Sequence, residues 1–311
     1  MEREAAQAEL RARLIEAGHL YPQPYQGLWA FGGDFEAVLA GVERQVHLME
    51  PLQGVRQMTF PPFLGEREFV ATGYMNSFPQ LIGSVDVFTG DNREHRKMVA
   101  AKDAGEDWTT YLTPAHLDLV SAPCHATYPM HAGTTLEEPV KYEVSSRCFR
   151  HEPSDDPMRL VSFRMREKVC FGTPEAAVEH RELGMRVGPE LLRSMGLTIE
   201  VEPANDPFFG RAAQIFAQGQ LDAGLKYEFV CKVYGDENSG TALGSSNYHN
   251  DHFGLDFDVH VPGGGLAHSS CIGFGLERVT VALFATHGMD VSTWPADVRA
   301  VLGLSSDEQS A

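Results

Sequence analysis

The sequence predicts an α+β protein whose core is an antiparallel β-sheet flanked by helices. Segments with the helical spacing of apolar residues are mixed with short apolar segments typical of strands, without the regular alternation that accompanies a parallel sheet. The chain has 311 residues, of which 43% are hydrophobic, and this suits a packed core. It contains no internal repeat and no low-complexity linker. We therefore expect a single domain over residues 1–311.

Three helices are expected towards the two ends of this domain. The first covers residues 1–18, within a helical extension over residues 1–33, and a Pro- and Gly-rich turn follows it. The second covers residues 34–48 and the third residues 275–286. Their apolar positions recur every three or four residues, as on one face of a helix: Phe35, Val38, Leu39, Val42 and Val46 in the second, and Leu276, Val279, Leu283 and Phe284 in the third.

Most strands are expected in the middle of the chain. Residues 110–170 read as β-rich, because short apolar runs are broken by polar turns. Two further strands are expected over residues 225–234 and 254–261. The prolines within residues 58–63 restrict that segment to a sheet edge or a strand end. Helices are expected over residues 174–194, opened by Pro174, and over residues 209–220.

The charge balance disfavours extended nucleic-acid binding. The chain has 43 acidic and 25 basic residues, a net charge of −18, and no block of Lys and Arg to meet a phosphate backbone. It has no uninterrupted apolar stretch of about 18 residues, and its first residues lack the apolar core of a signal peptide. We therefore expect a cytoplasmic protein without a membrane span. Its five cysteines then indicate reduced thiols or metal ligands.

Residues 146–169 predict a charged antiparallel hairpin with a long polar tip. Arg150 and Glu152 are two residues apart, and Arg159, Phe163 and Glu167 are four apart, so each set shares one face of its strand. Such a face offers cations, carboxylates and an aromatic ring, which could bind a nucleotide. An exposed hairpin with surface ion pairs is the simpler alternative. Neither a P-loop nor a G-x-G-x-x-G motif is present, so any phosphate site is built differently.

These residues resemble the motifs of class II aminoacyl-tRNA synthetases. Phe149-Arg150-His151-Glu152, a loop and Arg159-x-x-x-Phe163 resemble motif 2, and Gly273-Phe-Gly-Leu-Glu-Arg278 resembles motif 3. The helix over residues 34–48, with Phe60-Pro-Pro62, is similar to motif 1, the dimer-interface element, and implies a homodimer. The motifs occur in the family's order, and the resemblance covers roughly residues 30–290. It implies the synthetase fold.

The resemblance also implies an ATP site. Arg150 would contact the α-phosphate as a catalytic residue, and Glu152 would bind the adenine amino group. Arg278, the second catalytic residue, would meet the γ-phosphate. Arg159 would hold the β- and γ-phosphates, Phe163 would stack on adenine, and Leu160 belongs to the same ATP-binding segment. Mg²⁺ is expected with ATP. For Phe163 alone, packing in the core is the alternative.

Cys124, Glu167 and Cys271 resemble the zinc ligands of archaeal-type seryl-tRNA synthetases and of their truncated relatives, the amino acid:[carrier protein] ligases. The resemblance implies one Cys₂Glu zinc site per chain, with an open position for the substrate's α-amino group. Glu167, Ser246 and Asn247 would contact the amino acid. The alternatives are buried thiols without metal, or a site that uses other ligands: His249, His252 or His268. Three further cysteines are expected in the core: Cys148, Cys170 and Cys231.

The truncated ligases fit this sequence better than the tRNA-charging enzymes. About 33 residues precede the motif 1 region, too few for a tRNA-binding arm, and the net charge is −18. We expect ATP-dependent activation of a small amino acid, glycine or alanine, and its transfer to the phosphopantetheine thiol of a carrier protein, without tRNA. Residues 174–220 are expected to form a helical insertion that could dock the carrier.

Two alternatives remain at this point. One is a seryl-type tRNA-charging enzyme that uses a separate tRNA-binding partner, and the other is a non-catalytic regulatory paralogue of a synthetase. Thr241 and Ala242 stand where seryl enzymes usually have an acidic residue, so the Mg²⁺ ligands are not assigned.

Overall fold

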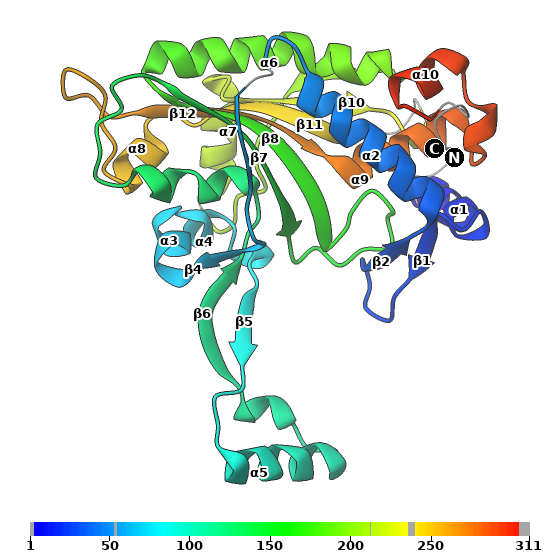
Figure 1. Cartoon of the computed structure of the whole chain (residues 1–311), viewed down its shortest axis with the longest axis vertical. Helices are drawn as coiled ribbons and strands as arrows, with labels where there is room; N and C mark the ends of the chain where they lie inside the picture. Colours follow the sequence, from blue (N-terminus) through cyan, green and yellow to red (C-terminus); the bar gives the residue numbers. More distant parts are fainter. Residues whose placement is uncertain (1–2, 53–54, 212, 236–239, 305–311) are drawn as a thin grey trace, which may run out of the picture.

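A seven-stranded β-sheet forms the centre of the molecule (Figure 1). The computed structural model describes residues 3–52, 55–211, 213–235 and 240–304. The strand order is β3-β7-β8-β12-β11-β10-β9; β3 is parallel to β7, and all other neighbours in the sheet are antiparallel. This architecture confirms the predicted α+β class. The strands are β3 (Arg56–Thr59), β7 (Val140–Phe149), β8 (Ser162–Gly172), β9 (Glu200–Pro203), β10 (Lys226–Cys231), β11 (Thr241–Tyr248) and β12 (His268–Gly275).

Helices α6 (Pro174–Ser194) and α9 (Leu276–His287) pack on one face of this sheet, and α6 lies along the sheet in Figure 1. Helix α2 (Gly33–Leu48) packs on α9, and α1 (Arg3–Glu16) joins the same core at its edge. The apolar residues predicted for the second and third helices are all buried. On this face they pack with Ile272 and Phe274 of β12. The helices over residues 34–48, 174–194 and 275–286 are therefore confirmed.

Helix α6 packs unusually close to the sheet. A Cβ atom at Gly184 would lie 2.3 Å from the Ile272 side chain, and one at Gly188 would lie 2.3 Å from the Phe229 ring. Real Cβ atoms do not approach side chains so closely, so only glycine permits this contact. Residues 174–194 thus form a layer of the fold, and the helical insertion over residues 174–220 stays a prediction from the sequence. The rest of that segment contains the edge strand β9 and helix α7 (Ala213–Asp222).

Residues 254–261 are not the strand that the sequence predicted. They belong to helix α8 (His252–Asp256) and the turns after it. The alternating apolar residues explain the error: Phe257, Val259 and Val261 are buried in a second core cluster, whereas Leu255 is 65% exposed. Asp258 has a positive φ of 53°, which interrupts any extended strand.

An arm that the sequence did not predict projects from the body of the molecule (Figure 1). Its strands, β5 (Ser84–Val87) and β6 (Thr113–Leu119), form a second sheet with β4 (Phe63–Gly65), and α5 (Asn92–Asp103) lies at its tip. Of the residues in α5, only Ala101 is buried, so the apolar pattern that reveals other helices is missing. Two short helices, α3 (Glu66–Ala71) and α4 (Tyr74–Ser77), lie where the arm joins the body. A separate hairpin, β1 (Leu20–Pro22) with β2 (Trp29–Phe31), follows α1.

Within the described residues, no helix has both the length and the apolar character needed to cross a membrane.

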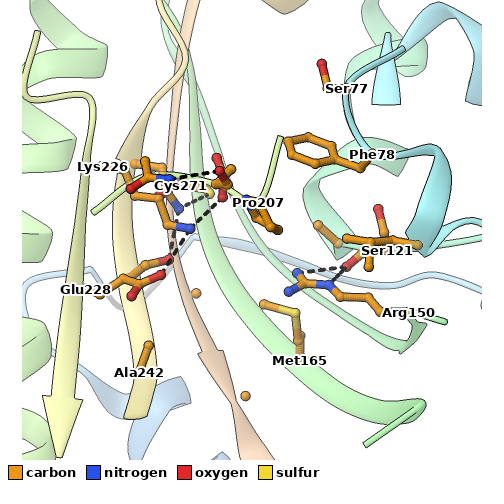
Figure 2. Close-up of a pocket in the computed structure, with 18 of the residues that line it drawn as sticks. Ser77, Phe78, Ser121, Arg150, Met165, Pro207, Lys226, Glu228, Ala242 and Cys271 are labelled. Carbon is orange, nitrogen blue, oxygen red and sulfur yellow. Dashed lines mark hydrogen bonds and ion pairs between the residues drawn. The ribbon is translucent and has the colours of Figure 1, made fainter. Parts of the chain in front are cut away.

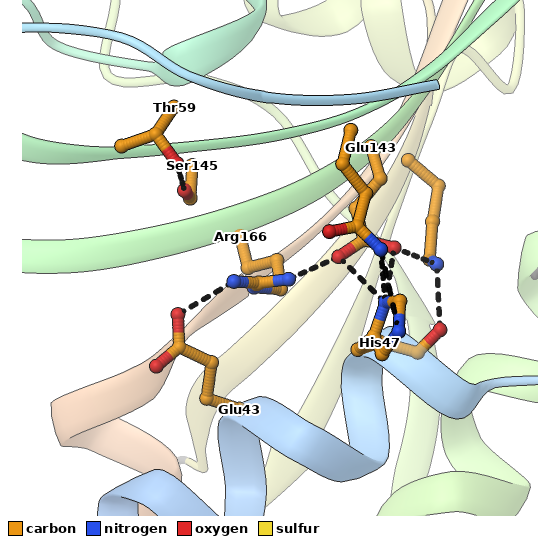
Figure 3. A network of polar contacts seen from close by, with 8 residues as sticks. Glu43, His47, Thr59, Glu143, Ser145 and Arg166 are labelled. Carbon is orange, nitrogen blue, oxygen red and sulfur yellow. Dashed lines mark hydrogen bonds and ion pairs between the residues drawn. The ribbon is translucent and has the colours of Figure 1, made fainter. Parts of the chain in front are cut away.

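The charged residues of β8 that face the helices form ion pairs with α2 and with Glu143 of β7 (Figure 3). Arg166 bonds to Glu43 of α2 at 2.8 Å and also to Glu143 of β7. Lys168, 1% exposed, lies 2.6 Å from the same Glu143 carboxylate, which also accepts from His47. Part of the charge in the predicted hairpin thus forms structural ion pairs. These pairs lie on the helix side of the sheet and not on an exposed surface.

Candidate active site

A cavity of about 1020 Å³ opens on the face of the sheet that the helices leave uncovered (Figure 2). Because successive side chains of a strand point to opposite faces, Cys271, Gly273 and Gly275 line the cavity while Ile272 and Phe274 pack against the helices. Residues from β8, β10 and β11 complete the floor. Other lining segments lie within residues 72–81, 121–125, 205–208 and 215–220. Its volume matches the upper end of the range for small-molecule sites, about 300–1,000 Å³.

Most residues predicted to bind ATP meet in this cavity: Arg150, Glu152, Arg159, Phe163 and Arg278 all line it. Arg150 donates from Nε and Nη2 to the Ser121 carbonyl at 3.3 and 3.2 Å (Figure 2), and its guanidinium carbon lies 5.4 Å from the Phe163 ring centre. Arg159 is ion-paired with Glu152 at 2.8 Å. Strand β7 ends at Phe149, so Arg150 and Glu152 reach the cavity from the turn after that strand rather than from the strand itself.

Arg278 lies at one end of the cavity, in the first turn of α9. Its Nε donates to the Met158 carbonyl at 2.7 Å and its Nη1 to the Ala242 carbonyl at 3.3 Å. Burial, followed by the nearby cations Arg150 and Arg159, lowers the pKa of Arg278 to about 10. The guanidinium is still charged at neutral pH, and two of its charged neighbours are cations while two, Glu152 and Asp156, are carboxylates. An anionic ligand such as a phosphate group would offset the repulsion between the three guanidinium groups.

Two predicted site residues do not line the cavity. Leu160 belongs to the loop before β8 and is buried, at 4% exposure. Ser246 is fully buried, and its hydroxyl donates to the Arg181 carbonyl of α6 at 2.8 Å, on the helix side of the sheet. Strand alternation explains the second error, because Ser246 and Asn247 are adjacent and cannot face the same side. Asn247 does line the cavity, together with Ser245.

The predicted metal ligands converge at the other end of the cavity. One possible ligand atom from each of Cys124, Glu167 and Cys271 lies within 4.8 Å of the others, and all three residues are buried. Glu167 accepts from the backbone N–H of Cys124 at 2.9 Å. Two thiols and a carboxylate suit Zn²⁺. From Cys271 to Gly275, β12 advances by about 13 Å, so this set and Arg278 mark opposite ends of one cavity.

The electrostatics of this set also fit a cation. Burial, followed by the neighbouring Cys271, raises the pKa of Glu167 to about 8. The hydrogen bond with Cys271, followed by burial, raises the pKa of Cys124. The hydrogen bond from Cys124 lowers the pKa of Cys271, so Cys271 is the member of the set that most readily becomes negatively charged. A divalent cation would stabilise all three groups in the negatively charged state.

The three histidines that are alternative metal ligands each have a different partner. His249 Nε2 is 3.6 Å from Cys271 Sγ, and Asn247 Nδ2 donates to the same sulfur at 3.3 Å. His252 contacts the Thr72 carbonyl, and His268 pairs with the Tyr248 hydroxyl. The remaining cysteines, Cys148, Cys170 and Cys231, are buried and free, as expected.

The structure adds a charged group that the sequence did not predict. Lys226 of β10 bonds to Asp206 at 2.5 Å and to Glu228 at 3.1 Å, and all three line the cavity (Figure 2). Gln220 of α7 donates to Asp206 at 2.9 Å, so the group joins the sheet to α7. Lys226 and Glu228 are charged residues two apart in an otherwise apolar strand. This pattern could have indicated that both face a polar site. Asp206 offers no such signal, because it lies in an irregular loop.

The curated proteins that are similar in sequence to this chain are ligases. Amino acid–[acyl-carrier-protein] ligase 1 of Bradyrhizobium diazoefficiens is 43% identical over 253 residues, 81% of this chain and 77% of the relative. Ligase 2 of the same organism is 40% identical over 256 residues, 82% and 76% respectively. A type-2 serine–tRNA ligase of Methanopyrus kandleri is 26% identical over 194 residues, 58% of this chain and 36% of the relative. No protein-family model matches the chain.

Solved structures share the fold. The M. kandleri seryl-tRNA synthetase, in complex with tRNASec of A. aeolicus, superposes with a TM-score of 0.81 at 21% identity, over 96% of this chain and 60% of that one. The seryl-tRNA synthetase of Pyrococcus horikoshii, complexed with ATP, gives 0.69 at 16% identity, over 96% and 62%. The chain thus spans about three fifths of these synthetases, and the predicted class II fold is confirmed. By its identity to the two B. diazoefficiens enzymes over most of both chains, it belongs to the amino acid–[acyl-carrier-protein] ligase family.

Proposed function

We propose that this enzyme activates a small amino acid with ATP and transfers it to the phosphopantetheine thiol of a carrier protein. One observation carries the proposal: the arginine-lined end and the Cys124–Glu167–Cys271 set belong to a single cavity. A nucleotide and an amino acid bound at these two ends would meet between them. The names of the B. diazoefficiens relatives support the carrier protein as acceptor.

In the activation step, a carboxylate oxygen of the amino acid attacks the α-phosphorus of ATP. The bond from the α-phosphorus to the bridging oxygen breaks, and pyrophosphate leaves with the electron pair. Arg150 would neutralise charge on the α-phosphate as it develops, and Arg278 would hold the γ-phosphate. Phe163 would stack on adenine, Glu152 would accept from its amino group, and Arg159 would hold the β- and γ-phosphates.

Cys124, Glu167 and Cys271 would hold one Zn²⁺ ion. When bound, it would fix the amino acid through a neutral α-amino group. Asn247 donates to the Cys271 sulfur and lines the cavity. It would orient Cys271 as a zinc ligand and would also lie next to the bound amino acid. Mg²⁺ would arrive with ATP. Thr241 and Ala242 carry no carboxylate, and Glu228 of β10 brings one into the cavity.

We place the preference for glycine or alanine at this metal end of the cavity. Lys226 pairs in register with Asn247, and Asn247 pairs with Cys271, so the three stand in one row across neighbouring strands. Lys226 is held by two carboxylates and cannot move aside easily. A large side chain on the amino acid would clash with this row, whereas glycine or alanine would fit.

The test of the function uses two assays on the full chain. Pyrophosphate exchange into ATP should depend on glycine or alanine among the twenty amino acids. A phosphopantetheinylated carrier should then be labelled through a bond that hydroxylamine cleaves, whereas the carrier without its prosthetic arm should stay unlabelled. Efficient charging of bulk tRNA would instead support the seryl-type alternative. The absence of exchange with any amino acid would support a non-catalytic paralogue.

We further propose that the carrier docks at the mouth of the cavity, on α7 and the loop before it. Ile215 and Phe216 of α7 are 73% and 57% exposed and line the cavity. The Phe208 ring lies 5.8 Å from that of Phe216, and the next residue, Phe209, is 60% exposed. Grouped exposed apolar residues are typical of an interaction site. A carrier seated here would deliver a flexible arm directly into the cavity, so only a small contact area is needed. This narrows the docking region from residues 174–220 to the part after β9.

Phe209→Asp should therefore weaken transfer to the carrier and spare activation. Phe209 does not line the cavity, so exchange should stay within about twofold of wild type, while KM for the carrier rises about tenfold, typical of losing an apolar interface contact. Leu255→Asp, at a residue 65% exposed on α8, is the matched control and should change neither value. Equal effects of the two variants would exclude this docking surface.

We also propose a homodimer. Strand β3 is an edge strand of the large sheet, and it follows α2, the helix that resembles motif 1. The cytoplasmic location and the absence of a tRNA substrate stay predictions from the sequence.

A further inference from the structure

Helix α1 brings a cation into the cavity. Arg3, in the first turn of this helix, is among the lining residues. Its Nη2 donates to Thr241 Oγ1 at 3.2 Å, and its guanidinium carbon lies 5.2 Å from the Tyr234 ring centre. Thr241 directly precedes Ala242, whose carbonyl accepts from Arg278. Two guanidinium groups, from α1 and α9, therefore reach successive residues of β11.

The position of α1 is fixed by the loop that precedes β8. Gln7 Nε2 donates to Asp156 Oδ2 at 2.7 Å, and Asp156 Oδ1 accepts from the Met158 backbone N–H at 2.9 Å. The Met158 carbonyl in turn accepts from Arg278 Nε at 2.7 Å. A continuous chain of hydrogen bonds thus links α1 to Arg278. Three apolar residues of α1 also pack in the main core: Ala6, Leu10 and Leu14.

The charges at this end suit a ligand with several negative charges. Burial, followed by the cations Arg150 and Arg159, lowers the pKa of Arg278, although the carboxylates Glu152 and Asp156 act in the opposite direction. The two carboxylates have partners in Arg159 and Tyr234. Arg3 adds another cation to this end of the cavity, because burial raises the pKa of the Tyr234 hydroxyl overall while Arg3 and Arg278 both act to lower it. Of the parts of ATP, the β- and γ-phosphates carry most of the negative charge. A planar guanidinium can donate two parallel hydrogen bonds to such phosphate oxygens.

We propose that Arg3 is a phosphate-binding residue that contacts the β- and γ-phosphates of ATP, which leave as pyrophosphate, next to Arg278. The proposal rests on the proposed function, in which the cavity binds ATP with its triphosphate towards Arg278. It adds α1, which resembles none of the three class II motifs, to the nucleotide site. It also implies that Arg3 distinguishes ligands with a pyrophosphate group from AMP.

The test measures binding rather than turnover alone. Arg3→Ala, in the full chain with its purification tag at the carboxyl end, is titrated by calorimetry with Mg-ATP, pyrophosphate and AMP. Loss of a charge-assisted hydrogen bond should raise the Kd for Mg-ATP and for pyrophosphate about tenfold. The Kd for AMP should stay within about twofold, since AMP lacks the phosphates that Arg3 contacts. Arg3→Lys, which keeps the charge but loses the planar fork, should recover part of the affinity.

Arg11→Ala is the matched control. Arg11 lies on the same helix and contacts the same loop, through Asp155 at 3.0 and 3.3 Å, but it does not line the cavity. It should bind all three ligands like the wild type. The proposal is overturned if Arg3→Ala binds Mg-ATP normally, or if it loses AMP and Mg-ATP equally, because an equal loss indicates a distorted loop. Wild-type protein that binds no Mg-ATP would overturn the proposed function as well.

Discussion

Cys124→Ala and Cys271→Ala should each remove bound zinc and abolish amino-acid-dependent pyrophosphate exchange. The three ligand atoms lie within 4.8 Å of one another in a buried site, so each variant leaves only two of the proposed ligands. Zinc sites in proteins rarely use fewer than three protein ligands. Metal analysis of the purified wild type should find about one zinc per chain. In the two variants it should fall to below about a tenth of that, since even outer-shell changes weaken metal sites about 10–100-fold.

Cys231→Ala is the control for this prediction. Cys231 is also buried, at 6% exposure, but it belongs to the end of β10 and does not line the cavity. Its loss removes a small apolar contact and no proposed ligand, so the zinc content and exchange should be unchanged. Circular dichroism of all three variants checks that they remain folded. Equal loss of zinc from all three would contradict the assignment, because a site at Cys124 and Cys271 does not involve Cys231.

The residues that the sequence predicted well have a local or a family-specific signal. Phe35, Val38 and Leu39 lie on the buried face of α2 because helical periodicity alone determines which side meets the core. Arg150 and Arg278 lie in one cavity, although about 130 residues separate them. No local pattern indicates that proximity. Only the resemblance to the class II motifs did so.

The errors also have physical causes. The family resemblance implies both Ser246 and Asn247 as substrate contacts, yet adjacent residues of a strand face opposite sides, and Ser246 bonds to α6. Residues 254–261 alternate like a strand, but alternation also occurs where turns present every second residue to a core. Arg3 and Asp206 carry no pattern of their own. Their place in the cavity follows from the packing of α1 and from the ion pair with Lys226, which are tertiary features.

Arg150→Ala should lower the rate of pyrophosphate exchange by at least about a hundredfold, the scale for removing one preorganised contact to a transition state. Arg150 is held in place before any ligand binds. Its Nε and Nη2 donate to the Ser121 carbonyl, and Phe163 lies against its guanidinium group. A cation in a fixed position needs no reorganisation as charge builds on the α-phosphate. The loss should therefore fall mainly on the maximal rate and less on KM for the amino acid.

Arg147→Ala is the matched control, since Arg147 lies three residues earlier on β7, is exposed and does not line the cavity. Its exchange rate should stay close to that of the wild type. Arg150→Lys should be intermediate, because lysine restores the charge but cannot donate from two nitrogens at once. Thermal unfolding of each variant separates a loss of chemistry from a loss of structure. Arg150→Ala with wild-type exchange and wild-type stability would remove Arg150 from the phosphate site and leave Arg278 and Arg159 as the cations that hold the triphosphate.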